Sequence, residues 1–340
     1  MQKANDFFKG MNILVTGGTG SIGRRLIDVL LTFNPKVIRV FSRDESKQYD
    51  MRQDYDNYRN IRYLIGDVRD SSRVERAMEN VDIVFHLAAL KHVPSCEYNP
   101  FEAVKTNAMG TQNVIQGALE ANVGRVIFTS SDKSISPTNA MGATKLLAER
   151  LISAADFYKG PKKTIFTAIR FGNVLGSRGS VVPLFIRQIL EKRKITLTDP
   201  KMTRFMMTLG QAVNLTLESA MKARGGEVFI LKMPVMILED LSEVIIQEVC
   251  KKNSINPKEI KIESIGLRPG EKLFEELMTI DEARHARELE NMFSILPIFT
   301  NKKNTYPGSK PAKEKSYCSA DEKHLTVEQI RKLLLKEKVV

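Results

Sequence analysis

The chain has 340 residues, 42% of them hydrophobic and 27% charged, as is typical of a globular enzyme. No apolar run approaches the roughly 20 residues of a membrane-spanning helix, and the start lacks a signal peptide's apolar core. The three cysteines have no metal-like spacing, which argues against a disulfide framework or a metal site. We therefore expect a cytoplasmic protein. The net charge of +12 is compatible with a polyanion such as a nucleotide diphosphate or with a generally basic surface, and the lack of a recognition motif argues against nucleic acid.

Short apolar runs alternate with helical patterns through the first half of the chain. The first run, 12–16, has no polar alternation, as expected of a strand buried on both faces. We expect strands over 12–16, 37–41, 61–65, 81–85, 125–129 and 164–169. We expect helices over 22–30, 72–80, 101–121 and 141–158. This alternation predicts an α/β fold with a Rossmann-like, doubly wound parallel sheet.

The pattern loosens after residue 170. Helical stretches over 209–221 and 239–252 and a strand over 260–264 predict a smaller mixed α/β substrate-binding lobe, and a capping box at Thr326 and Gln329 predicts a last helix, 327–338. The expected division is an N-terminal extension (1–10), an NAD(P)-binding Rossmann core (11–170), a substrate-binding lobe with returns to the core (171–300), and a basic C-terminal loop and helix (301–340).

Three glycines follow the first expected strand and open the first expected helix. Gly17 permits a tight turn, Gly20 lets the backbone approach a pyrophosphate, and Gly23 lets the helix pack on the strand. The helix N-terminus adds amide donors and a favourable dipole. This context predicts a bound nicotinamide dinucleotide. The expected cofactor-binding residues are Gly17, Thr19, Gly20, Ser21, Ile22, Gly23, Ser42, Arg43, Lys47, Asp67, Val68, Leu87, Ala88, Ala89 and Lys145.

The end of the second strand bears on which cofactor is bound. A carboxylate there often grips the ribose hydroxyls of NAD, but this chain has Ser42, followed by Arg43 and, one turn on, Lys47. An arginine in this place can hold a 2′-phosphate. The pattern favours NADP, and NAD stays possible because Asp44 and Glu45 follow directly.

The run 139–145 contains Met141 and Lys145, one helical turn apart. Behind a glycine-rich nucleotide loop, a Tyr-x-x-x-Lys pair is the redox catalyst of a very large group of dehydrogenases. Here methionine replaces the phenol that would accept a hydroxyl proton. Just upstream, Ser131, Asp132 and Lys133 place a hydroxyl, an acid and an amine in a row. The acid–base chemistry must therefore be distributed differently.

These motifs resemble a known family. From about residue 10 to residue 300, the chain is similar to extended short-chain dehydrogenases/reductases of the polysaccharide-biosynthesis type, close to the UDP-N-acetylglucosamine 4,6-dehydratases. The segments that carry the resemblance are 17–23, 41–45, 86–94, 97–100, 129–133, 139–145, 170–180 and 268–272. Such enzymes take hydride from sugar C4, lose water across C5 and C6, and return the hydride to C6. The resemblance thus implies a lyase, often hexameric or otherwise oligomeric, that makes a UDP-4-keto-6-deoxy-hexosamine for surface glycans.

The resemblance also implies residue roles. Lys145 would orient the nicotinamide ribose and lower the pKa of nearby hydroxyls, and Ser131 would bind the sugar O4. Asp132 is the candidate acid for the C6 oxygen, and Lys133 is the candidate base for C5, which requires a neutral amine with a depressed pKa. Met141 transfers no proton, so the O4 proton would pass to Lys133, to Lys145 through water, or through Ser131.

For the nucleotide-sugar, the resemblance points to cations and polar groups of the second half of the chain. Arginine pairs bidentately with phosphate oxygens, and Glu271 could accept from the uridine ribose. The expected substrate-binding residues are Lys91, Arg170, Asn173, Ser180, Arg204, Arg268 and Glu271.

Two other functions stay open on the sequence. A UDP-sugar 4-epimerase needs no acid for C6, and a non-catalytic nucleotide-sugar-binding protein would account for Met141 and for the basic tail. Asp132 and Lys133 could also be an ordinary ion pair at the end of a strand, and each expected substrate-binding charge could singly be a surface charge.

Overall fold

A ten-stranded sheet forms the centre of the computed structural model, which describes residues 2–297 and 306–340. Its order is β3-β2-β1-β4-β5-β6-β10-β15-β14-β16, and the seven strands from β3 to β10 are parallel. The strands are β1 (Asn12–Thr16), β2 (Val37–Ser42), β3 (Ile61–Ile65), β4 (Ile83–His86), β5 (Arg125–Ser131), β6 (Ile165–Phe171), β10 (Val228–Leu231), β14 (Ala286–Glu288), β15 (Met292–Ile295) and β16 (Lys310–Pro311). The predicted Rossmann-like, doubly wound sheet is confirmed.

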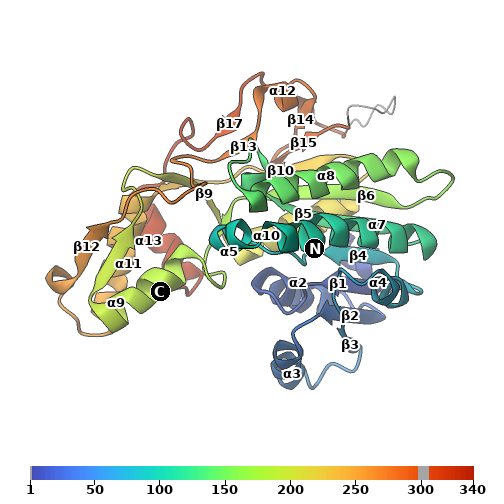
Figure 1. Cartoon of the computed structure of the whole chain (residues 1–340), viewed down its shortest axis with the longest axis horizontal. Coiled ribbons are helices and arrows are strands. Elements are labelled where there is room, and N and C mark those ends of the chain that lie inside the picture. The colour runs from blue at the N-terminus through green and yellow to red at the C-terminus, as the bar shows by residue number, and fades with distance from the viewer. Residues whose placement is uncertain (1, 298–305) are drawn as a thin grey trace.

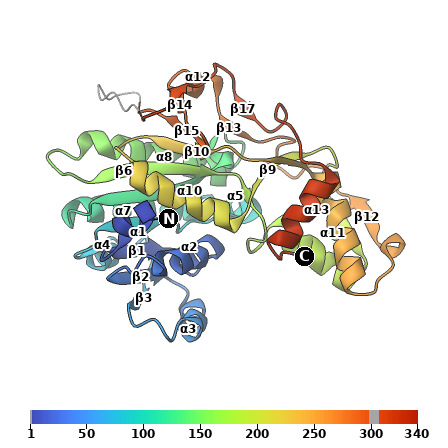
Figure 2. The same ribbon diagram turned by 180° about the vertical axis from the view of Figure 1, so that it is seen from behind.

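Helices cover both faces of this sheet (Figures 1 and 2). One layer holds α4 (Ser71–Met78), α7 (Gly110–Glu120) and α8 (Ala140–Tyr158). The other holds α1 (Gln2–Phe8), α2 (Ser21–Leu31) and α10 (Leu209–Lys222). Helix α3 (Glu45–Asp54) follows β2, with Asp44 as its N-cap.

The single helix expected over 101–121 is divided. Short helices α5 (Val93–Tyr98) and α6 (Pro100–Ala103) lead into a π-helical segment, η1 (Val104–Met109), which continues as α7. The side chain of Asn107, within η1, accepts from the backbone N–H of Leu90 at 2.8 Å and donates to the Leu90 carbonyl at 3.1 Å. The segment therefore fixes the strand-end loop after β4, beside which the candidate site lies.

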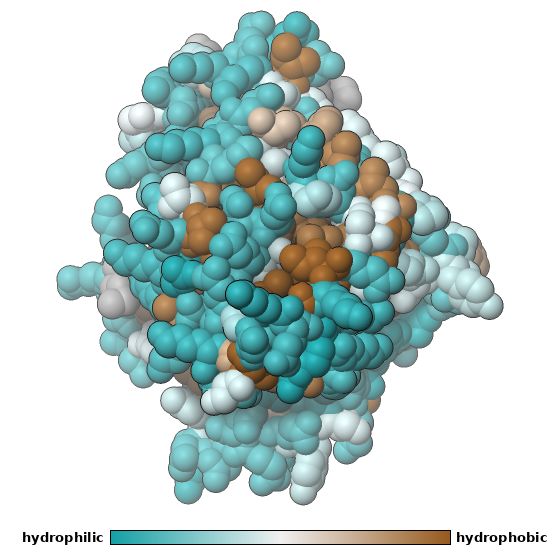
Figure 3. Space-filling model, turned by 90° about the vertical axis from the view of Figure 1, so that its left-hand side faces the viewer, coloured by the Kyte–Doolittle hydropathy of each residue, from teal (hydrophilic) through white to brown (hydrophobic). Residues whose placement is uncertain are grey.

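A smaller lobe has its own apolar cluster. It packs α9 (Val181–Lys192), α11 (Leu238–Lys252) and α13 (Val327–Lys336) with the parallel pair β8 (Lys194–Leu197) and β12 (Lys261–Ser264). The predicted capping box at Thr326 is present. Figure 3 shows the outer face of this lobe, which is mainly hydrophilic with an apolar patch near its middle. The mixed α/β lobe expected beside the Rossmann sheet is thus present.

Short elements connect the lobe to the sheet. They include β7 (Asn173–Val174), β9 (Thr203–Met207), β11 (Val235–Ile237), β13 (Glu276–Met278), β17 (Tyr317–Cys318), α12 (Ile280–Ala283) and the 3-10 turn η2 (Asp132–Ser134). A second 3-10 turn, η3 (Pro257–Glu259), lies within the lobe between α11 and β12. Strand β13 pairs antiparallel with β17, which brings a late segment of the chain to the carboxyl end of β5. Among residues 2–297 and 306–340, no helix has the length and apolarity needed to cross a membrane.

At the chain ends, the structure adds detail to one expectation and corrects another. The N-terminal extension forms helix α1, whose Phe8 is fully buried. The basic loop expected between residue 301 and the last helix contains β16 and β17 where it is described, and residues 301–305 lie outside the described residues. The limits of the proposed domains stay predictions.

Helix α1 contributes to the core of the Rossmann sheet. The Phe8 ring lies 5.8 Å from the ring of Phe33 and 6.3 Å from that of Phe85, centroid to centroid. We expect Phe8→Ala to lower the free energy of unfolding by about 3–5 kcal/mol, because it removes a buried aromatic ring and leaves a cavity. Chemical denaturation measures this loss. The exposed Lys3, changed to alanine, is the control from the same helix and should stay within about 0.5 kcal/mol. Equal stability of the two variants would contradict a structural role for α1.

Candidate active site

The glycine-rich loop between β1 and α2 opens a groove of about 590 Å³. Gly17 has φ +68°, and a Cβ there would lie 2.8 Å from the backbone nitrogen of Ala88, so only glycine fits between β1 and the loop after β4. All fifteen residues expected to bind the cofactor line this groove, and it follows the carboxyl ends of the parallel strands. The bare backbone and the N-terminus of α2 fit a pyrophosphate.

Cations surround the place expected for the adenosine ribose, at the end of β2. Ser42 Oγ lies 3.1 Å from Thr19 Oγ1, Arg43 lies 3.8 Å from Asp67, and Lys47 pairs with Asp44. Hydrogen bonds from the Lys47 side chain and backbone hold the pKa of Asp44 below its usual value. These carboxylates are therefore already paired with cations.

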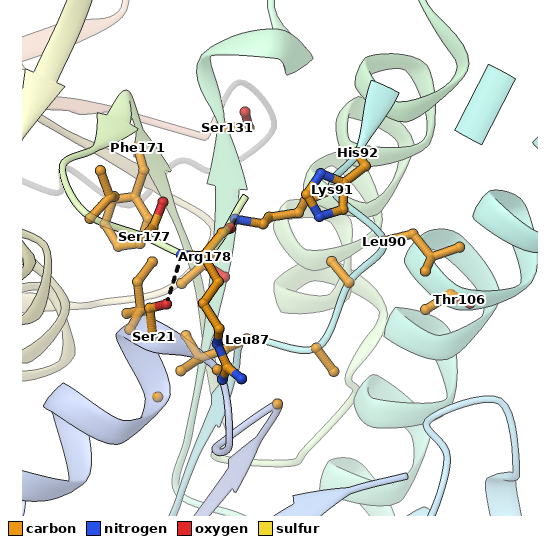
Figure 4. Close-up of a pocket in the computed structure, with 18 of the residues that line it drawn as sticks. Ser21, Leu87, Leu90, Lys91, His92, Thr106, Ser131, Phe171, Ser177 and Arg178 are labelled. Carbon is orange, nitrogen blue, oxygen red and sulfur yellow. Dashed lines mark hydrogen bonds between the residues drawn. The ribbon is translucent and has the colours of Figure 1, made fainter. Parts of the chain in front are cut away.

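Arg178, to which the sequence analysis gave no role, comes from the segment after β7 and crosses the groove (Figure 4). Its backbone N–H donates to Ser21 Oγ at 3.2 Å, and its guanidinium donates to the Thr19 carbonyl. From the opposite wall, Lys91 donates to the Arg178 carbonyl at 2.7 Å. The segment thus bridges the two walls above the phosphate loop.

Lys145 and Met141 lie on one face of α8 and both line the groove. Lys145 is buried; its Nζ donates to the Thr129 carbonyl at 2.5 Å and lies 4.2 Å from the centre of the Phe128 ring. Burial lowers the pKa of Lys145 to about 7, against a smaller opposing effect of Glu149. Met141 is 4% exposed and belongs to a small apolar cluster with Cys96 and Ala103.

At the end of β5, Lys133 lies between two buried carboxylates. Its Nζ is 3.2 Å from both oxygens of Asp132 and 3.3 Å from Glu275 Oε1. A Cβ on Gly142 would lie 2.1 Å from the Lys133 carbonyl, so α8 packs directly on this turn and fixes it. Ser131 Oγ donates to Asp132 Oδ1 at 2.7 Å.

The protonation state of Lys133 differs from the expectation. Its side chain is 25% exposed, and burial alone would lower its pKa, but the negative charges of Asp132 and Glu275 outweigh burial. The pKa of Lys133 is therefore raised, and the resting side chain is an ammonium. The expected depressed pKa is wrong for this arrangement.

A second cavity of about 300 Å³ adjoins the groove and continues into the smaller lobe. Lys91, Lys133, Asn173 and Ser180 line both cavities, whereas Arg204, Arg268 and Glu271 line only the second. Arg204 holds the preceding loop, because its guanidinium donates to the carbonyls of Thr203, Lys272 and Leu273. Six of the seven expected substrate-binding residues thus line the second cavity.

Arg170 is the exception, and its assignment is corrected. It is fully buried, lines neither cavity, and pairs with Glu149 on α8 and Glu282 on α12 through nitrogen–oxygen distances of 2.6–3.0 Å. Its guanidinium also donates to the Leu277 carbonyl of β13 at 3.0 Å. These partners leave no donor for a diphosphate, so Arg170 joins β6 to the segment that carries Glu275.

Relatives of known sequence extend over most of this chain. A Methanocaldococcus jannaschii protein named as an uncharacterized membrane protein is 50% identical over 98% of each chain. The inverting UDP-N-acetylglucosamine 4,6-dehydratase of Campylobacter jejuni serotype O:23/36 is 43% identical over 85% of this chain and 84% of its own. The UDP-glucose 4-epimerase of Rickettsia typhi is 40% identical over 96% of each chain.

Solved structures share the fold. Pen from Bacillus thuringiensis is 54% identical and matches with a TM-score of 0.94 over 98% of this chain and 99% of its own. DesIV, a dTDP-glucose 4,6-dehydratase from Streptomyces venezuelae with NAD and TYD bound, is 21% identical, with a TM-score of 0.68 over 77% and 87%. The sequence profile of the family described as polysaccharide biosynthesis protein matches residues 13–297. The chain therefore belongs to this polysaccharide-biosynthesis family of extended short-chain dehydrogenases/reductases.

Proposed function

We propose that this chain is a nucleotide-sugar 4,6-dehydratase that converts UDP-N-acetylglucosamine into a UDP-2-acetamido-2,6-dideoxy-4-keto-hexose for surface glycan synthesis. The observation that carries the proposal is the Asp132–Lys133 pair, which lies beside the candidate cofactor groove with Lys133 at its junction with the second cavity. The name of the Campylobacter jejuni relative supports it. After oxidation at C4, the proposed reaction removes a proton from C5 and protonates the departing C6 oxygen. It therefore needs a base and an acid at the junction of the two cavities.

The Asp132–Lys133 pair is suited to supply an acid and a base together. Lys133 begins as an ammonium, and both Asp132 oxygens lie 3.2 Å from its Nζ. Transfer of one proton from Nζ to Asp132 gives a neutral amine and a carboxylic acid. The amine then takes the C5 proton, the acid protonates the departing C6 oxygen, and both groups return to their starting charges. A lowered resting pKa for Lys133 is therefore not required.

The proton of the C4 hydroxyl needs a separate acceptor, because Met141 has none. Lys145 has a pKa of about 7 and lines the groove, so a large fraction is neutral amine at neutral pH. We assign the O4 proton to Lys145, directly or through one water, with Ser131 binding O4. A bound nicotinamide would take the hydride from C4 and return it to C6. The Lys133 ammonium would then give a proton to C5, and the proton that O4 gave to Lys145 would restore the charge of Lys133, so the cycle consumes no proton.

NADP is the cofactor that we propose. Arg43 and Lys47 line the groove together with Ser42, and Arg178 donates to the carbonyl of Thr19, whose Oγ1 lies 3.1 Å from Ser42 Oγ. Three cations at the ribose end suit a 2′-phosphate better than two free hydroxyls. The NAD bound to the distant relative DesIV supports a nicotinamide cofactor and does not choose between the two.

A UDP-sugar 4-epimerase is the second candidate, since the Rickettsia typhi relative carries that name at 40% identity. Epimerisation moves hydride only at C4 and needs no acid at C6. Asp132→Asn therefore separates the two reactions: it leaves an epimerase largely active and stops a dehydratase. A non-catalytic protein would bind the UDP-sugar without converting it.

We also propose a homo-oligomer. Large apolar side chains are exposed on α5, α6 and α8, among them Tyr98 at 87% and Phe101 at 63%. Burial against a second copy of the chain would remove these rings from water.

The first prediction from the proposed function concerns turnover. Incubation of the cofactor-loaded protein with UDP-N-acetylglucosamine should give a product lighter by one water in mass spectrometry. Lys133→Ala should lower the rate by about 10²–10⁴-fold, because it removes the base. Met141→Ala is the control from the same cavity and should keep measurable activity, since methionine transfers no proton. Unchanged substrate with confirmed cofactor would refute the dehydratase, and equal loss in both variants would give Met141 a positioning role.

The second prediction concerns pH. If Lys145 accepts the O4 proton, the rate of cofactor reduction in a single turnover should fall as the pH drops below about 7, because the amine becomes protonated. The near-ultraviolet absorbance of the reduced nicotinamide measures this rate. Lys145→Arg keeps the positive charge and should be slow at every pH. A flat profile in the wild type would exclude Lys145 as the acceptor.

The third prediction concerns the cofactor. Arg178→Ala should weaken NADP binding by about tenfold or more, because it removes a charge-assisted contact to the 2′-phosphate, and should change NAD binding much less. Calorimetric titration of cofactor-free protein measures both. The exposed Arg187 on α9, which lies outside the groove, is the matched control. Equal losses for NADP and NAD would place Arg178 at a shared part of the cofactor.

A further inference from the structure

Glu275 is a buried carboxyl group that the sequence analysis did not assign. It directly precedes β13, its backbone N–H donates to Ser319 Oγ at 2.9 Å, and its side chain is 3% exposed. It lines the second cavity, whereas Asp132 lines the cofactor groove. The two carboxyl groups thus approach Lys133 from different cavities.

The two carboxyl groups differ in how they are satisfied. Asp132 Oδ1 accepts from Ser131 Oγ at 2.7 Å, from the Lys133 backbone N–H at 2.9 Å and from Lys133 Nζ at 3.2 Å. Glu275 Oε1 faces Lys133 Nζ, and Oε2 is buried with no hydrogen-bond partner among the described residues. Both oxygens of Asp132 therefore have hydrogen-bond partners, whereas one buried oxygen of Glu275 has none.

Every charged group that faces Glu275 belongs to this cluster in the described part of the chain. Asp132 and Lys133 come from η2, and Arg204 comes from β9, with its Nε 3.7 Å from Oε1 and its other donors on backbone carbonyls. Burial and the negative charge of Asp132 raise the pKa of Glu275, against the opposing charges of Lys133 and Arg204. A proton on Oε2 would remove the negative charge from this buried oxygen, which has no hydrogen bond to stabilise that charge.

We propose that Glu275 is a positioning residue that is protonated in the active enzyme, where its neutral form leaves Lys133 free to pass its proton to Asp132. When Glu275 ionises, it becomes a second negative partner for Lys133 and holds that side chain as an ammonium, which cannot take the C5 proton. This inference rests on the proposed dehydratase reaction. It assigns Glu275 the neutral form that the reaction requires.

The test compares Glu275→Gln with the wild type across pH. Glutamine has the size of glutamic acid and carries no charge at any pH, so it imitates the protonated form. The wild-type turnover number should fall with rising pH, by up to about tenfold per pH unit, above the pKa of Glu275. The Glu275→Gln variant should reach the wild-type maximum and stay level over the same range. Glu276→Gln, at the next residue and outside both cavities, should keep the wild-type profile.

Two outcomes would overturn the proposal. If Glu275→Gln still binds UDP-N-acetylglucosamine but is inactive at every pH, Glu275 itself delivers a proton. If its turnover falls with pH as the wild type does, Glu275 does not control Lys133.

A second measurement separates this proposal from the dehydratase reaction. Nuclear magnetic resonance of protein with ¹³C-labelled lysine follows the titration of Lys133, whose signal is identified by its absence in Lys133→Ala. The pKa of Lys133 should be lower in Glu275→Gln than in the wild type, because a carboxylate partner is lost, and unchanged in Glu276→Gln. An unchanged pKa in Glu275→Gln would refute the coupling. If the pKa of Lys133 falls in Glu275→Gln as expected but the wild type does not dehydrate UDP-N-acetylglucosamine, the proposed function is refuted and the coupling of Glu275 to Lys133 stands.

Discussion

The arrangement of the site depends on one charge contact: the Lys133 ammonium between Asp132 and Glu275. A buried carboxylate costs several kcal/mol in isolation, and the Lys133 cation offsets this cost for Asp132, and for Glu275 whenever Glu275 is ionised. The contact also joins distant parts of the chain, since Asp132 and Lys133 directly follow β5 whereas Glu275 precedes β13. The charge contact and the sheet therefore together hold in place the residues at the junction of the two cavities.

The fold holds this contact from two sides. Helix α8 packs on the Lys133 backbone at Gly142, where no side chain fits. On the other side, Arg170 ties β6 to α8, α12 and β13 through Glu149, Glu282 and the Leu277 carbonyl. An arginine with two carboxylate partners in the protein interior is costly to break, because loss of one partner leaves an uncompensated charge. Arg170 thus stabilises the segments that carry the site residues and lines neither cavity.

The sequence predicted the parts of the site that are local in the chain. The phosphate loop, the strand-end residues Ser131 to Lys133, and Lys145 one helical turn after Met141 follow from strand–helix alternation, because parallel strands end at the same edge of a sheet. Glu275 could not be found this way, since its place depends on the antiparallel pairing of β13 with β17, about forty residues later. Arg170 was misassigned because a motif arginine looks the same in sequence whether its partners are phosphates or buried glutamates. The split of the helix over 101–121 likewise comes from contacts of Asn107 with a distant loop.

Met141 has a physical consequence beyond the loss of a phenol. A tyrosine would place a hydroxyl next to Lys145 and offer its ammonium a polar neighbour, whereas methionine extends the apolar wall that includes Cys96 and Ala103. A drier wall favours the neutral form of a buried lysine. The pKa of Lys145, about 7, results mainly from burial, so an amine that can be neutral lines the groove where the phenol is missing. A tyrosine restored at position 141 would therefore add a second candidate proton acceptor one helical turn from this amine.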